Sequence, residues 1–108
     1  MSYVEGTNYY RTPRAQHKNS PNLYIFRSVD ILATYSSYAF VDMIAPHPLL
    51  MIAGEKADTL YFSEDAIKAA KEPKELFVVK GKTHIDLYDQ PDEVMPKLVE
   101  FMEKYLTA

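Results

Sequence analysis

Two short, wholly apolar runs are the feature that most limits how this chain can fold. Residues 49–53 read Leu-Leu-Met-Ile-Ala and are closed by Gly54, while residues 76–79 read Leu-Phe-Val-Val and are soon followed by Gly81. Neither run alternates apolar and polar residues, so each is typical of a strand covered on both faces, as in a parallel sheet. Because a predicted helix joins them, we expect a right-handed parallel βαβ unit.

Helix signals surround these two predicted strands. Apolar side chains recur at helical spacing across residues 29–44, with Ser28 as the expected N-cap. Ser63 is the expected N-cap of the connecting helix, and Pro73 ends it. The last segment has one apolar and one charged face and predicts a helix that begins just before Pro96. The predicted fold class is therefore α/β, with helices flanking the strands in αβα layers.

Length and composition limit the domain organisation. The 108 residues include 47% hydrophobic residues, enough for one small folded domain. Residues 1–27 are polar and rich in turn residues, and they predict a lead-in segment without a core of its own. Residues 28–108 are the predicted domain.

Charge and cysteine content exclude several classes of protein. The net charge of −3 and the pI near 5.5 give no electrostatic footprint for a nucleic acid. No apolar run approaches the roughly 20 residues of a membrane span, so we expect no membrane partner. The absence of cysteine excludes disulfides and thiolate sites and is typical of a cytoplasmic protein, which is the predicted location.

A carboxylate and an imidazole follow the two predicted strands. Asp58 lies in the loop after the first strand, and His84 follows the second. The carboxyl ends of parallel strands meet at one edge of a sheet, so both side chains are expected there. A carboxylate that orients an imidazole is half of the machinery of acyl transfer. Glu55 is the alternative acid, and Asp86 is predicted to solvate the turn that follows.

The remaining candidate residues favour plainer interpretations. His17 and His47 are isolated, so we expect them to be structural or to face solvent and predict neither a metal site nor a cofactor. A basic cluster near the N-terminus is too small by itself to predict phosphate binding. Its members are Arg11, Arg14, His17 and Lys18.

Several short motifs, in this order, resemble the C-terminal portion of an α/β-hydrolase of the dienelactone-hydrolase-like and prolyl-oligopeptidase-like bacterial families. They are Glu55-Lys56-Ala57-Asp58, Phe62-Ser63-Glu64-Asp65-Ala66 and Gly81-Lys82-Thr83-His84. The resemblance implies hydrolysis of esters or related acyl compounds by a serine triad, in which Asp58, or Glu55 in its place, orients His84 as the base.

The nucleophile of that family has no counterpart in this chain. The family's serine lies in a Gly-x-Ser-x-Gly turn, whereas the only glycines here are Gly6, Gly54 and Gly81. The resemblance therefore predicts a C-terminal hydrolase fragment that is inactive alone. The alternatives are a protein that self-associates through its open sheet edges, and half of a split hydrolase completed by an N-terminal half on another chain.

Overall fold

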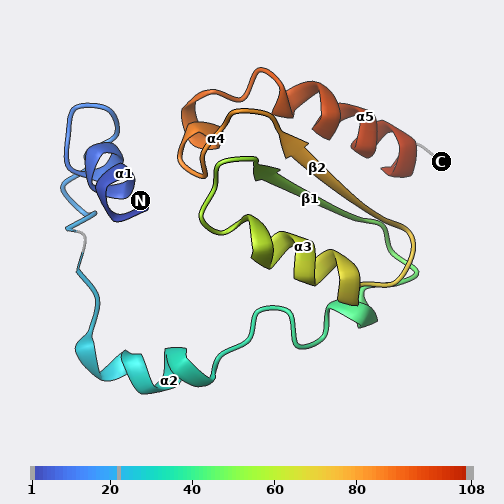
Figure 1. Ribbon diagram of the computed structural model, residues 1–108, viewed down its shortest axis with the longest axis horizontal. Helices are drawn as coiled ribbons and strands as arrows, with labels where there is room; N and C mark the ends of the chain where they lie inside the picture. Colours follow the sequence, from blue (N-terminus) through green and yellow to red (C-terminus); the bar gives the residue numbers. More distant parts are fainter. Residues whose placement is uncertain (1, 22, 107–108) are drawn as a thin grey trace. The chain divides into compact units, whose positions relative to one another are not determined.

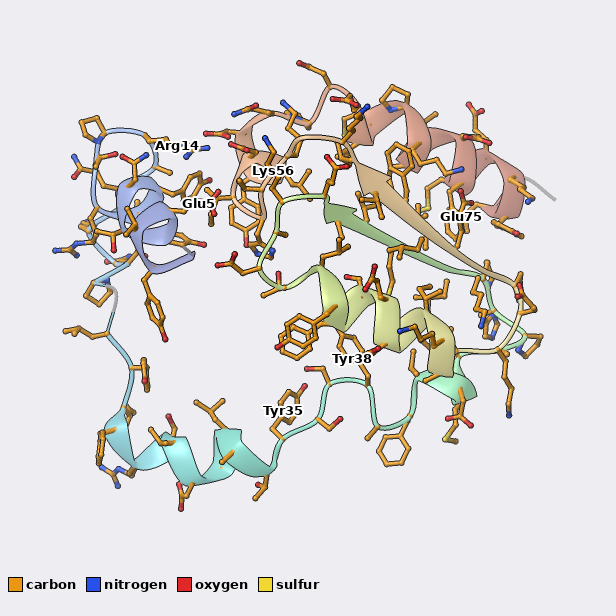
Figure 2. The ribbon with its side chains drawn as sticks, viewed as in Figure 1. Glu5, Arg14, Tyr35, Tyr38, Lys56 and Glu75 are labelled. Carbon is orange, nitrogen blue, oxygen red and sulfur yellow. The ribbon has the colours of Figure 1, made fainter. Side chains whose placement is uncertain are left out.

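The computed structural model describes residues 2–21 and 23–106, and it divides the chain into two compact units, residues 1–39 and residues 40–108. The lead-in segment predicted from the sequence ends earlier, at residue 27. The first unit contains the helix α1 (Ser2–Tyr10), which the sequence analysis did not predict. The order of the elements along the chain can be followed in Figure 1.

The predicted parallel βαβ unit is confirmed in residues 40–108. Strand β1 (Leu49–Gly54) pairs in parallel with β2 (Lys74–Val79), in a register that matches Leu49 with Lys74. Helix α3 (Leu60–Ala69) connects them. Figure 1 shows α3 on one side of the strands and α5 (Val94–Leu106) on the other. The chain is therefore an α/β protein with a two-stranded parallel sheet and flanking helices.

The core lies entirely within residues 40–108. Six apolar residues are buried among those described: Val41, Ala53, Ala66, Ala70, Val79 and Ile85. Most of them come from the two strands, from α3 and its C-terminal end, and from the loop after β2. The other apolar side chains of the strands are only half-buried or exposed, so this sheet is less completely covered than the sequence pattern predicted.

The helix predicted over residues 29–44 is wrong in extent. Helix α2 covers only Val29–Thr34, flanked by the short 3-10 turns η1 (Phe26–Ser28) and η2 (Val41–Met43). Tyr35 already has an extended backbone, with ψ of 133°. None of the residues of α2 is buried, so tertiary packing does not stabilise a longer helix there.

Neither of the two predicted serine caps forms. Helix α3 begins at Leu60, three residues before Ser63, with Thr59 at the N-cap position. Ser28 does precede α2, but its hydroxyl donates a hydrogen bond backward to the Ile25 carbonyl instead of accepting one from the helix. Helix α5 begins two residues before Pro96, as predicted, because proline is tolerated in the first turn.

Among residues 2–21 and 23–106, no helix has both the length and the apolar character needed to cross a membrane.

Candidate functional site

The loops that follow β1 and β2 are bonded to each other. The amide of Glu55 donates to the Val79 carbonyl at 2.9 Å, and the amide of Lys56 donates to the Lys82 carbonyl at 2.8 Å. Gly54 permits this approach, because a Cβ there would lie only 2.6 Å from the Thr83 carbonyl oxygen. The carboxyl edge of the sheet is thus a well-defined frame for side chains.

Glu55, the alternative acid, is part of that frame. Its carboxylate accepts a hydrogen bond of 2.8 Å from the amide of Gly81, a residue with a φ of +73° in the turn after β2. This contact joins the loops of the two strands across 26 positions of sequence. The geometry therefore gives Glu55 a structural role, because its carboxylate joins the two loops.

His84 lies at this edge with both ring nitrogens close to hydroxyl groups. Its Nε2 lies 2.8 Å from the hydroxyl of Tyr88, and its Nδ1 lies 3.4 Å from the hydroxyl of Thr59. The Tyr88 ring also meets the imidazole edge-on, with centroids 5.3 Å apart. Because a neutral imidazole has one donor and one acceptor nitrogen, a proton on Nδ1 would leave Nε2 to accept from the Tyr88 hydroxyl.

A reciprocal capping arrangement fixes the backbone on either side of His84. The amide of Thr83 donates to the Asp86 carboxylate at 3.0 Å, and the amide of Asp86 donates to the Thr83 hydroxyl at 3.2 Å. This pair starts the short helix α4 (Asp86–Asp89), which carries Tyr88. Asp86 therefore orders the turn around His84 through its own hydrogen bonds, whereas the sequence predicted only that it would solvate the turn that follows.

Asp58 lies in the β1–α3 loop, where its side chain is exposed, and it directly precedes Thr59. The structure thus brings the two predicted loops together through Thr59 and His84. Thr59 and Tyr88 were not predicted from the sequence as neighbours of the imidazole. The spacing of four residues between His84 and Tyr88, which is one helical turn, was the signal that could have found Tyr88.

His17 belongs to the first unit and His47 to the second, and both are exposed. Within the described ranges, no three histidine or acidic side chains come together in a way that could hold a metal ion.

The sequence of this chain is similar to parts of three longer proteins. Uncharacterized protein PA2218 of Pseudomonas aeruginosa is 37% identical over 107 residues, covering 95% of this chain and 29% of that protein. Uncharacterized protein YcjY of Escherichia coli is 32% identical over 102 residues, covering 91% of this chain and 33% of that protein. A polyketide transferase of Gibberella fujikuroi is 32% identical over 77 residues, covering 68% and 24%. No family model matches.

The fold is shared with a solved structure. The crystal structure of hypothetical protein PA2218 from Pseudomonas aeruginosa matches 97% of this chain with a TM-score of 0.87 and 35% identity, and the match covers 34% of that chain. The chain therefore spans about a third of the length of PA2218 and YcjY.

These comparisons overturn the prediction of an α/β-hydrolase fragment. The match along 97% of the chain is to a hypothetical protein, and none of the three named relatives is called a hydrolase or an esterase. The assignment to the dienelactone-hydrolase-like or prolyl-oligopeptidase-like family, and the truncated hydrolase function drawn from it, are therefore wrong. An acid and a histidine at the carboxyl ends of parallel strands occur in many kinds of site, so these two residues alone do not specify a hydrolase.

Proposed function

We propose that His84 is the general base of an acyl-transfer site, acting directly on the hydroxyl or thiol that receives the acyl group. The observation that carries this proposal is the exposed imidazole, set between the Thr59 and Tyr88 hydroxyls at the carboxyl edge of the sheet. The polyketide transferase of Gibberella fujikuroi, which matches 68% of the chain, supports group transfer as the reaction class.

The proposed reaction needs no nucleophilic serine. The acceptor oxygen or sulfur attacks the carbonyl carbon of an activated acyl donor such as a thioester, while His84 takes the acceptor's proton. The tetrahedral intermediate then collapses, the bond to the donor's sulfur breaks, and the imidazolium returns the proton to the departing thiolate. The acyl group has moved from sulfur to the acceptor, and His84 is neutral again.

Tyr88 and Asp58 have different tasks in this proposal. With Nδ1 protonated, Nε2 faces the Tyr88 hydroxyl at 2.8 Å, so the phenol orients the imidazole ring. The acceptor then either displaces the Tyr88 hydroxyl from Nε2 or transfers its proton to Nε2 through that hydroxyl. Asp58, in the loop that also supplies Thr59, stabilises the imidazolium by its negative charge. Glu55 is assigned no chemical step because it ties the strand loops together.

The test uses the full chain, a short-chain acyl thioester of N-acetylcysteamine and a panel of alcohols and thiols, with the product detected by mass spectrometry. We expect transfer above background, reduced about 100-fold in His84→Gln because general base catalysis is typically of that size. Asp58→Asn is expected to reduce it about tenfold. A folded wild-type chain that transfers no acyl group would refute the proposal.

Two further variants separate chemistry from structure. Asp65→Asn removes an exposed carboxylate of α3, which pairs with Lys68 at 3.1 Å, and should leave transfer unchanged. Tyr88→Phe keeps the ring but removes the hydroxyl that faces Nε2. A fall in rate for Asp65→Asn equal to that of Asp58→Asn would show that net charge, and not the placement of Asp58, controls the reaction.

A second candidate function is self-association through the sheet edges. In the described part of the chain β1 and β2 pair only with each other, so each leaves one edge open. Apolar strand residues stay half-buried or exposed, with Val78 at 38%. Two strands alone are marginally stable, and open edges of this kind pair with other chains. We propose a second copy of this chain as the partner.

The ladder hydrogen bonds identify the residue to change. The amides of Leu49 and Glu55 donate to carbonyls at and just before β2, so by the alternation of a parallel strand the amide of Ile52 faces the open edge. Light scattering over a concentration series should show a dimer or larger assembly, which Ile52→Pro should dissociate. A wild-type monomer at all concentrations would exclude this function without affecting the transfer proposal.

A further inference from the structure

The first unit, residues 1–39, contains a cavity that the proposed acyl transfer does not use. Its volume is about 410 Å³, and it is lined by the end of α1 and the following loop: Tyr10, Arg11, Gln16, His17 and Lys18. The four basic residues of this region are too few for the sequence alone to predict phosphate binding. In the structure three of the four line the same cavity, so they can act on one ligand together.

The loop that forms the cavity is closed by backbone hydrogen bonds. The amide of Ala15 donates to the Tyr9 carbonyl at 3.1 Å, and the amide of Gln16 donates to the Thr12 carbonyl at 2.9 Å. The guanidinium of Arg11 also donates through Nη1 to the Pro21 carbonyl at 3.1 Å. These contacts hold the loop and position Arg11 before any ligand arrives, which lowers the entropy cost of binding.

The lining groups are predominantly hydrogen-bond donors. Arg11 has five N–H groups, and its described contact with the Pro21 carbonyl uses only Nη1. The amide of Asn19 donates to Nδ1 of His17 at 3.1 Å, so Nδ1 is an acceptor and the neutral ring bears its proton on Nε2. Lys18 adds an ammonium group, and no Asp or Glu is among the lining residues. Side chains that mainly donate hydrogen bonds, with no carboxylate among them, favour the binding of an anion.

The size of the cavity and the geometry of its donors select the class of anion. A guanidinium binds two oxygens of a phosphate at once, and a lysine nearby adds a point charge. A volume of about 410 Å³ is within the range of small-molecule sites and larger than inorganic phosphate requires. We infer that this cavity binds the phosphate group of a small organic phosphate, with Arg11 and Lys18 as its main ligands and His17 Nε2 as a further donor.

The experiment titrates the full chain with glycerol 3-phosphate, and separately with inorganic phosphate and acetate, by calorimetry and by amide chemical shifts. We expect glycerol 3-phosphate to bind and to shift amides of residues 10–19. Lys18→Gln, which removes an ammonium group from the lining of the cavity, should raise the dissociation constant about tenfold. Arg11→Gln should raise it at least as much.

Arg27→Gln is the matched control, because it removes the same charge from an exposed site in the same unit that does not line the cavity. It should leave binding within about twofold of wild type. Equal effects of Arg27→Gln and Lys18→Gln would mean diffuse attraction and would overturn the inference. So would the absence of any glycerol 3-phosphate binding at millimolar concentration, or acetate binding as tightly. Because none of these residues belongs to the His84 site, failure here leaves the acyl-transfer proposal standing.

Discussion

The two units of this chain differ in how their apolar side chains are used. In residues 40–108 a parallel strand pair and its connecting helix bury the core, and Val79 is only 1% exposed. In residues 1–39 no described residue is buried, and large side chains such as Tyr3, at 90%, and Phe26, at 87%, are open to solvent. Local helices form in both units, but only pairing between distant segments produces a core.

That difference predicts where stability resides. Burial of apolar surface is the main favourable term of folding, so the free energy of unfolding should depend on residues 40–108 far more than on residues 1–39. Substitutions of one chemical kind, made once in each unit, test this directly.

The largest effect is expected for Gly54→Val. The Cβ of the new side chain would lie only 2.6 Å from the Thr83 carbonyl oxygen, and a backbone oxygen cannot move away as the end of a flexible side chain can. We expect a loss of about 3 kcal/mol in the free energy of unfolding, measured by urea denaturation. The loops that hold His84 should separate, so the His84 and Tyr88 resonances should also shift.

Gly6→Ala is the matching substitution in the first unit. Gly6 lies in α1, and a Cβ there meets no atom within 4 Å. Alanine favours a helix over glycine by up to about 1 kcal/mol, so α1 should gain helicity while the main unfolding transition stays in place. A loss of stability as large as that of Gly54→Val would contradict the contrast between the units.

Val79→Ala and Val29→Ala form the second pair. Val79 is 1% exposed at the end of β2, whereas Val29 is 42% exposed at the start of α2. Removing two methyl groups from the core should cost about 2 kcal/mol, and removing them from α2 less than about 0.5 kcal/mol. The two urea midpoints give the comparison, and similar midpoints would show that α2 has a buried face after all.

The same contrast decides what could be predicted from the sequence. The two strands were predictable because apolar runs ended by glycine have few alternatives, and strand topology placed Asp58 and His84 in the loops that follow them. The helix over residues 29–44 was not, because its apolar periodicity had no core to pack against and ended at Tyr35. Thr59 and Tyr88 were missed because their roles depend on where His84 points.

A smaller effect is expected from Lys74→Met at the start of β2. The Lys74 ammonium donates to the Ile67 and Ala70 carbonyls, each at 2.7 Å, and so satisfies the C-terminal end of α3. Methionine keeps most of the apolar stem but leaves these carbonyls without that donor, for a cost of about 1.5 kcal/mol. Lys68→Met, which breaks only an exposed pair with Asp65, should cost less than about 0.5 kcal/mol.

The smallest effect concerns pH and the attachment of α5 to the sheet. Lys97 Nζ lies 2.5 Å from Glu75 on β2 and 3.3 Å from Glu100 on its own helix. The hydrogen bond with Glu75, followed by that with Glu100, raises the pKa of Lys97 above its ordinary value of 10.5, against an opposing effect of desolvation. A cation whose pKa is higher in the folded state stabilises the fold while it is protonated.

The stabilising contribution of Lys97 is therefore complete below pH 10.5, the value in the unfolded chain, and is lost as the pH rises through the higher folded value. We expect the difference in unfolding free energy between wild type and Lys97→Gln to be constant near neutral pH and to shrink in alkali. Glu75→Gln removes the principal partner, so in that background the difference should shrink much less. A wild-type excess that grew with alkaline pH would mean that Lys97 is more stable unprotonated, and that α5 is held by its apolar face alone.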